Sequence, residues 1–131
     1  MIFDHIGVVV PNLNSGKKFI SKILPITRFS PSIDDENLGV KIQFCYDESQ
    51  ICYELIAPHG VDSPIAISLA ENKNLINHIA YRAKDFEKTN YDLRNQGCKP
   101  LGIPKPAKAF NNQLVIFYLT PLKFIIEIIE D

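Results

Sequence analysis

The chain has 131 residues, 46% of them hydrophobic and 22% charged, and its net charge at pH 7 is −1. This length suits one domain over residues 1–131, or two small halves that share a core. The near-neutral charge gives no electrostatic reason to expect nucleic acid or a membrane surface as a partner.

The first half of the chain predicts a strand, a helix and three further strands. It opens with MIFDHIGVVV, an apolar run that lacks a basic leader and is too short to span a bilayer, so we expect a cytoplasmic protein. Asn14 or Ser15 is the expected cap of the helix, whose apolar residues recur at helical spacing. Strands are expected near residues 26–30, 38–46 and 50–57, with a tight turn at residues 47–50.

The second half repeats this order after a link of residues 58–74, in which Ser63 and Pro64 predict a helix start. A strand is expected over residues 75–83, and Asp85 and Gly97 are the expected cap and terminator of the next helix. Three strands follow near residues 99–103, 113–119 and 123–129. Module 1 therefore covers about residues 1–57 and module 2 about residues 75–131, each with the order βαβββ.

The cysteines indicate a reducing compartment, because their number is odd and no CxxC pair is present. Cys45 and Cys52 flank the turn at residues 47–50. They either oppose each other across a hairpin or are two small strand residues, and we favour the second interpretation.

A shift of 73 residues aligns the two halves. His5 falls on His78 and Glu54 falls on Glu127, so the spacing from histidine to glutamate is the same in both halves. Taken singly, each of these residues is more simply interpreted as a hydrogen-bonded core histidine or a solvated glutamate. Two polar residues kept at one offset instead favour a shared purpose.

That purpose is a metal site. Strand alternation puts His5 on one face with Phe3 and Gly7. Glu127 stands among four isoleucines, where an unpaired carboxylate would be strongly destabilising. Imidazole nitrogens and carboxylate oxygens together suit a divalent transition ion. We predict one divalent metal ion, with Co, Ni, Zn, Mn and Mg not distinguished, bound by His5, Glu54, His78 and Glu127.

Other polar and aromatic residues have simpler interpretations. His59 has no repeat partner and is interpreted as a turn residue, and Phe44 and Phe117 are interpreted as core residues. Lys105 and Lys108 lie on a loop that is either solvated or placed to meet a phosphate at the mouth of the site, and both alternatives stay open.

At these positions the chain resembles the vicinal oxygen chelate, or glyoxalase-like, superfamily. The resemblance covers nearly the whole length and is carried by FDHIG at residues 3–7, YELIAP at 53–58, NHIA at 77–80 and IIEI at 125–128. It implies an α+β fold in which two βαβββ modules form a cupped, mainly antiparallel sheet around one divalent metal. It also implies that the four predicted ligands are the metal ligands, and that a homodimer is the commoner assembly.

Within this superfamily, residues 54–58 and 60–66 are similar to a segment of the methylmalonyl-CoA epimerases. Some bacterial epimerases place a second carboxylate base in the third-strand region. Here that region reads Val40-Lys41-Ile42-Gln43, and the amide of Gln43 cannot take a proton.

The resemblance implies proton transfer next to a thioester carbonyl, in the first place racemisation of a short acyl-CoA. A divalent ion would stabilise the charge that develops on the carbonyl oxygen. Glu127 is the expected catalytic base, and Glu54 is the candidate for the second proton transfer. One alternative is a lactoylglutathione lyase (glyoxalase I) type of isomerase acting on a glutathione adduct. Another is a non-catalytic member that binds a small molecule.

Overall fold

The computed structural model describes residues 1–60, 63 and 76–131, so the predicted helix start lies outside the described residues except for Ser63 itself. The elements of the first half are β1 (Ile2–Val9), α1 (Leu13–Ile23), β2 (Ile26–Phe29), β3 (Ile33–Asp35), β4 (Val40–Asp47) and β5 (Cys52–Pro58). Those of the second half are β6 (Ile76–Ala83), α3 (Phe86–Asn95), β7 (Lys99–Pro100), β8 (Lys105–Ala107), the 3-10 turn η1 (Lys108–Phe110), β9 (Gln113–Leu119) and β10 (Ile125–Glu130).

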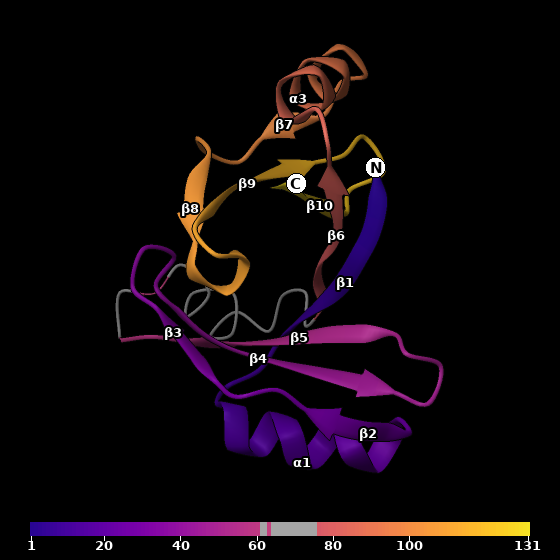
Figure 1. Ribbon diagram of the computed structural model, residues 1–131, viewed down its shortest axis with the longest axis vertical. Coiled ribbons are helices and arrows are strands. Elements are labelled where there is room, and N and C mark those ends of the chain that lie inside the picture. The colour runs from indigo at the N-terminus through magenta and orange to yellow at the C-terminus, as the bar shows by residue number, and fades with distance from the viewer. Residues whose placement is uncertain (61–62, 64–75) are drawn as a thin grey trace.

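The strands of both halves form one curved sheet in the order β2-β4-β5-β1-β6-β10-β9-β7, with β3 added to β4 and β8 added to β9. The pairs β1·β5 and β6·β10 are parallel, and the other pairs are antiparallel. Figure 1 shows α1 and α3 at opposite ends of the molecule, outside the curve of the sheet. The predicted α+β fold with a cupped, mainly antiparallel sheet is confirmed. The exact module boundaries stay a prediction.

Each helix packs its apolar side against the outer face of its own half of the sheet. Ile20 of α1 joins a cluster with Cys45 and Leu55, and Phe86 of α3 joins a second cluster with Tyr118. Neither helix of the described residues is long and apolar enough to cross a membrane.

The helix signals are partly as predicted. Asp85 caps α3 by accepting a hydrogen bond from the Lys88 backbone N–H, and Gly97 follows the helix with a φ of +88°. The predicted cap of α1 is wrong, because the Asn12 side chain accepts the hydrogen bond from the Ser15 N–H. The helix begins at Leu13, directly after the extended backbone of Asn12, which places the cap earlier than the apolar spacing indicates.

The predicted turn at residues 47–50 is present between β4 and β5. The interpretation that Cys45 and Cys52 could oppose each other is wrong, because Cys45 pairs with Tyr53 and Cys52 with Tyr46. This register turns the two thiols to opposite faces of the sheet. All three cysteines are free and buried.

The seam between the two halves is the antiparallel pair β1·β6, and its register is interrupted at Asp4. Phe3 pairs with Tyr81, but His5 pairs with Ala80, so β1 has one extra residue between these pairs. The bulge turns Phe3 to the outer face, where its ring meets Tyr81 edge-on, while His5 faces inward. The predicted shared face of Phe3 and His5 is therefore wrong.

A second connection joins the halves on the side away from this seam, where β3 and η1 lie close together (Figure 1). The fully buried Asp35 of β3 accepts a hydrogen bond from the Leu38 N–H at 3.1 Å. Its other carboxylate oxygen accepts one from the Lys108 N–H at 2.9 Å. One buried carboxylate thus ties module 1 to module 2.

Candidate metal centre and active site

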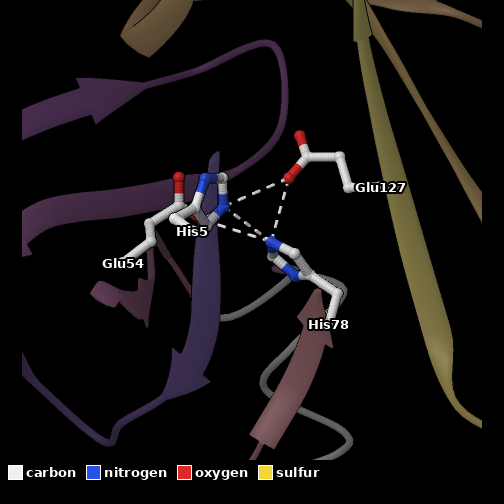
Figure 2. A group of neighbouring side chains, drawn as sticks. All are labelled: His5, Glu54, His78 and Glu127. Atoms are coloured by element: carbon white, nitrogen blue, oxygen red, sulfur yellow. Dashed lines mark hydrogen bonds and ion pairs between the residues drawn. The ribbon is translucent and has the colours of Figure 1, made fainter. Parts of the chain in front are cut away.

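The four predicted ligands lie on four adjacent strands at the centre of the sheet. His5 comes from β1, Glu54 from β5, His78 from β6 and Glu127 from β10, and the side chains point toward one another inside the curve (Figure 2). All four are buried, with exposed fractions between 0% and 4%. Strand pairing therefore brings together residues that the sequence separates by up to 122 positions.

Their nitrogen and oxygen atoms converge on a small volume. The two Nε2 atoms of His5 and His78 are 3.0 Å apart, and Glu127 Oε2 lies 3.3 Å from the first and 2.9 Å from the second. Glu54 Oε1 lies 3.6 Å from His5 Nε2 and 3.7 Å from His78 Nε2. Within the described part of the chain, Glu127 Oε2 is buried without a hydrogen bond of good geometry.

The centre has a strong preference for positive charge. Burial alone would lower the pKa of His5, but the carboxylates of Asp4, Glu127 and Glu54 raise it to about 12. Burial would raise the pKa of Glu127, yet the two imidazoles hold it below its usual range. The carboxylates that hold a proton on His5 are equally suited to hold a metal cation at the same Nε2 atom.

An aspartate beside the first ligand orients its ring. His5 Nδ1 lies 2.7 Å from Asp4 Oδ1, and Asp4 Oδ2 accepts a hydrogen bond from Arg82 Nε at 2.7 Å. Because Asp4 accepts the Nδ1 proton, the lone pair of the neutral ring is on Nε2, which points into the centre. Arg82 is therefore committed to Asp4 and does not lie free at the mouth of the site.

Three phenylalanines surround the imidazoles. Phe110 of η1 stacks on His5 with ring centroids 5.8 Å apart, and Phe44 meets the same ring edge-on at 5.7 Å. Phe117 meets His78 edge-on at 5.2 Å. The interpretation of Phe44 and Phe117 as core residues is correct in part: they pack in the inner cluster of the cup, but they also fix the ligand rings.

A cavity of about 400 Å³ opens onto the centre. Three of the four residues, Glu54, His78 and Glu127, line it, whereas His5 does not. A small molecule in the cavity would therefore reach the two carboxylates directly. Lys105 also lines the cavity, which places one positive charge at its edge.

The donor set fits a divalent metal ion. Each residue offers one ligand atom, and these atoms all lie within 4.8 Å of one another. Donors about 2.1 Å from one ion in a tetrahedral shell are about 3.4 Å apart, so donor atoms as far apart as 4.8 Å would have to approach each other by about 1.4 Å. Two imidazoles and two carboxylates match the N/O preference of transition ions, and three or four protein ligands leave room for a substrate oxygen.

A family description of the glyoxalase/bleomycin resistance protein/dioxygenase superfamily matches residues 4–117, which is most of the chain. The chain belongs to this superfamily. No curated protein matches it in sequence. Solved structures share the fold of this superfamily member over nearly its full length.

One similar structure is a hypothetical protein from Bacillus halodurans C-125, with a TM-score of 0.81 and 26% identity, covering 98% of this chain and 93% of the other. Methylmalonyl-CoA epimerase from Mycobacterium tuberculosis has a TM-score of 0.78 and 22% identity, with 98% and 86% covered. A methylmalonyl-CoA epimerase in complex with methylmalonyl-CoA and NH4+ has a TM-score of 0.78 and 21% identity, with 99% and 94% covered. At 21–22% identity, the likeness to the two epimerases shows that they and this chain have the same fold.

The structure brings together all four predicted site residues, while their roles as ligands and catalysts stay predictions. Sequence reasoning missed Asp4, Arg82 and Phe110 as supports of His5. A carboxylate next to a candidate ligand was a visible signal, but strand alternation would have pointed Asp4 away from the centre. It reaches the ring because it occupies the bulge. Phe110 gave no signal, since the 3-10 turn that carries it has no sequence pattern.

Gln43, the β4 residue compared above with an epimerase base, does not face the site. Phe44 pairs with Glu54 and shares its face, so Gln43 lies on the opposite face, where its side-chain N–H donates to the Ser30 carbonyl. Ile42 lines the cavity in its place. The wall that β4 presents to a substrate is therefore aliphatic and has no proton-transfer group.

Proposed function

We propose that the protein is a metal-dependent enzyme that transfers a proton at the carbon next to a thioester carbonyl. The observation that carries this proposal is the buried cluster of two imidazoles and two carboxylates at the base of a substrate-sized cavity. A divalent ion held by these residues would act as a Lewis acid on the substrate carbonyl, which acidifies the neighbouring C–H bond.

The two glutamates have the position that proton transfer needs. Glu127 reaches the cavity from module 2, and a cation bound at the centre would keep it ionised and hence able to accept a proton. Glu54 reaches the same cavity from module 1. If Glu127 removes the α-proton from one face and Glu54 delivers one to the other, the product is the epimer. In this scheme His5 and His78 would bind the metal and take no part in the proton transfer.

This arrangement favours racemisation of a short acyl-CoA. The epimerase folds described above support the assignment at the level of architecture, and Lys105 offers a positive charge at the cavity edge for an anionic substrate. The expected partner is accordingly a small-molecule thioester. A second copy of the chain, as a homodimer, and a cytoplasmic location remain part of the proposal.

A second candidate is a lactoylglutathione lyase type of isomerase, which moves a proton between adjacent carbons of a glutathione adduct. It is favoured by the presence of a glutamate, Glu54, as the second acidic donor of the centre. The same two carboxylates and the same cavity would serve it.

The deciding experiment is deuterium exchange in heavy water with metal-loaded protein. Methylmalonyl-CoA and the hemithioacetal of glutathione and methylglyoxal are incubated separately, and incorporation at the α-carbon is followed by NMR. Exchange with inversion of methylmalonyl-CoA supports the epimerase, and formation of deuterated lactoylglutathione supports the isomerase. A protein that binds metal but exchanges neither these substrates nor a longer-chain alkylmalonyl-CoA contradicts the proposal.

A further inference from the structure

The walls of the cavity differ sharply from its base. Beyond Glu54, His78 and Glu127, the described lining consists of aliphatic and aromatic side chains of both modules together with Gly102 and Lys105. Module 1 supplies Val40 and Ile42 from β4, and module 2 supplies Val115 and Phe117 from β9, together with other apolar residues. The repeat therefore places hydrophobic groups on both sides of the predicted metal.

Strand alternation keeps polar groups out of this wall. On β4, Val40 and Ile42 face the cavity, whereas Lys41 and Gln43 point to the other side. Among the described residues that line the cavity, Lys105 is the one ionisable group apart from the three predicted ligands. The described wall thus offers side-chain burial to a ligand and few hydrogen bonds.

The lip of the cavity is apolar as well. Leu101 and Ile103, in the segment between β7 and β8, line the cavity yet are 53% and 74% exposed. Large apolar side chains at the edge of a pocket gain the most when a ligand removes their remaining surface from water. The wall and the lip form one continuous hydrophobic surface that begins at the predicted metal.

We propose that the substrate carries an apolar group larger than methyl, which lies between Ile42 and the lip residues while its oxygen atoms face the metal. This inference rests on the proposed function, because it requires an ion at the four ligands. The methyl group of a methylmalonyl thioester would leave most of this surface in contact with water. An alkyl substituent of about three to six carbons would cover it, and Lys105 would lie beside the anionic part of the substrate.

Alkyl hydroxamates test the proposal, because they chelate a metal through two oxygens and carry a tail of chosen length. Binding of acetohydroxamate, butyrohydroxamate and hexanohydroxamate to zinc-loaded protein is measured by calorimetry. Burial of a methylene contributes up to about 0.8 kcal/mol, or about a fourfold change in Kd. We expect affinity to rise at least about tenfold from acetohydroxamate to hexanohydroxamate, and equal affinities would overturn the proposal.

Variants of the lip locate the effect. Ile103→Ser and Leu101→Ser remove apolar surface from exposed positions that the fold does not need. Both substitutions should lower the affinity for hexanohydroxamate severalfold and leave the affinity for acetohydroxamate unchanged. Leu122→Ser is the matched control, since Leu122 is 82% exposed and does not line the cavity. A control that loses as much tail affinity as the lip variants would overturn the assignment of the tail to this cavity.

The two levels of the hypothesis fail differently. If the protein binds no zinc, both the proposed function and this inference are overturned. If it binds one zinc and all hydroxamates equally, the metal centre stands and the inference about the apolar group is wrong.

Discussion

The two modules hold equivalent histidines by different means. His78 of module 2 stands opposite Gly7, and a Cβ atom added to Gly7 would overlap its imidazole ring. His5 of module 1 stands opposite Ala80, the repeat partner of Gly7, and its ring is oriented by Asp4 instead. The His78 ring packs closely against a bare backbone, and the His5 ring is hydrogen-bonded to the carboxylate of the preceding residue.

The surroundings of the centre differ in the same way. Module 2 sends Phe110 onto the His5 ring and supplies the apolar lip of Leu101 and Ile103, whereas module 1 contributes Leu38 from its corresponding turn. A spherical ion would need donors from both sides, which is consistent with the matched positions of the two His–Glu pairs. A substrate has two different ends, so the residues around the donors have no reason to match.

The largest expected effect on catalysis comes from replacing each of the two glutamates in turn by glutamine. Glu127→Gln removes the proposed base, and α-deuterium incorporation should fall by about 10²–10⁴-fold, the usual contribution of a general base. Metal content should stay near that of the wild type, because the amide oxygen remains a donor. Elemental analysis and exchange rates are measured on the same sample, and wild-type exchange would reject the assignment.

Glu54→Gln is the matched variant from module 1. It should slow racemisation strongly but keep isotope exchange on the face that Glu127 serves. Equal loss of exchange in both variants would mean that the two modules share the base role.

His5→Ala tests whether the centre needs donors from both modules. Loss of a ligand should lower zinc affinity by more than the about 10- to 100-fold that loss of an outer hydrogen bond costs. His78→Ala should behave alike, because the two nitrogens face the same point. Zinc stoichiometry is read by competition with a chromophoric chelator. A full equivalent of tightly bound zinc in either variant would contradict the site.

Asp4→Asn tests the hydrogen bond that module 1 uses to orient its histidine. The amide is a weaker acceptor for Nδ1–H and loses its ion pair with Arg82, so zinc affinity should fall about 10- to 100-fold. Asp34→Asn, an exposed acid on β3, is the control for loss of one negative charge and should leave affinity unchanged. Identical affinities in the two variants would remove Asp4 from the centre.

Gly7→Ala tests the close packing of the His78 ring against the backbone of Gly7. The added methyl group overlaps the His78 ring, so the ring must move, at a cost of about 1–3 kcal/mol in unfolding free energy. Zinc affinity should fall as well, but less than in His78→Ala. The reciprocal change, Ala80→Gly, leaves His5 in place and should alter zinc affinity little. Urea unfolding and chelator competition measure both quantities, and a Gly7→Ala protein with normal zinc affinity would show that the close approach is not required.

The sequence could predict the centre because duplication leaves a regular trace. The common offset of the two His–Glu pairs survives any uncertainty about strand ends, and the isoleucines around Glu127 require a partner for its charge. The main strands and both helices follow from apolar runs and from Asp85 and Gly97 as helix signals. These features depend on local chemistry, which the sequence displays directly.

The rest depends on register, which the sequence does not display. The bulge at Asp4 reverses the face of Phe3, and the pairing of β4 with β5 turns Ile42 rather than Gln43 to the cavity. The strands β3 and β8 are three residues each, and β8 contains Pro106, which argues against a strand by composition. Their existence follows from pairing with β4 and β9 and from the buried carboxylate of Asp35.

The buried Asp35 has a further consequence for ligand binding. Its carboxylate links the rim of one half to the rim of the other, on the side away from the β1·β6 seam, so the two halves are joined on both sides of the cup. Separating the halves would remove the Lys108 N–H from the buried Asp35 carboxylate, and a lost hydrogen bond at a buried charged group is costly. These contacts on both sides favour a preorganised cavity, so that ordering its walls would cost little of the binding free energy of a ligand.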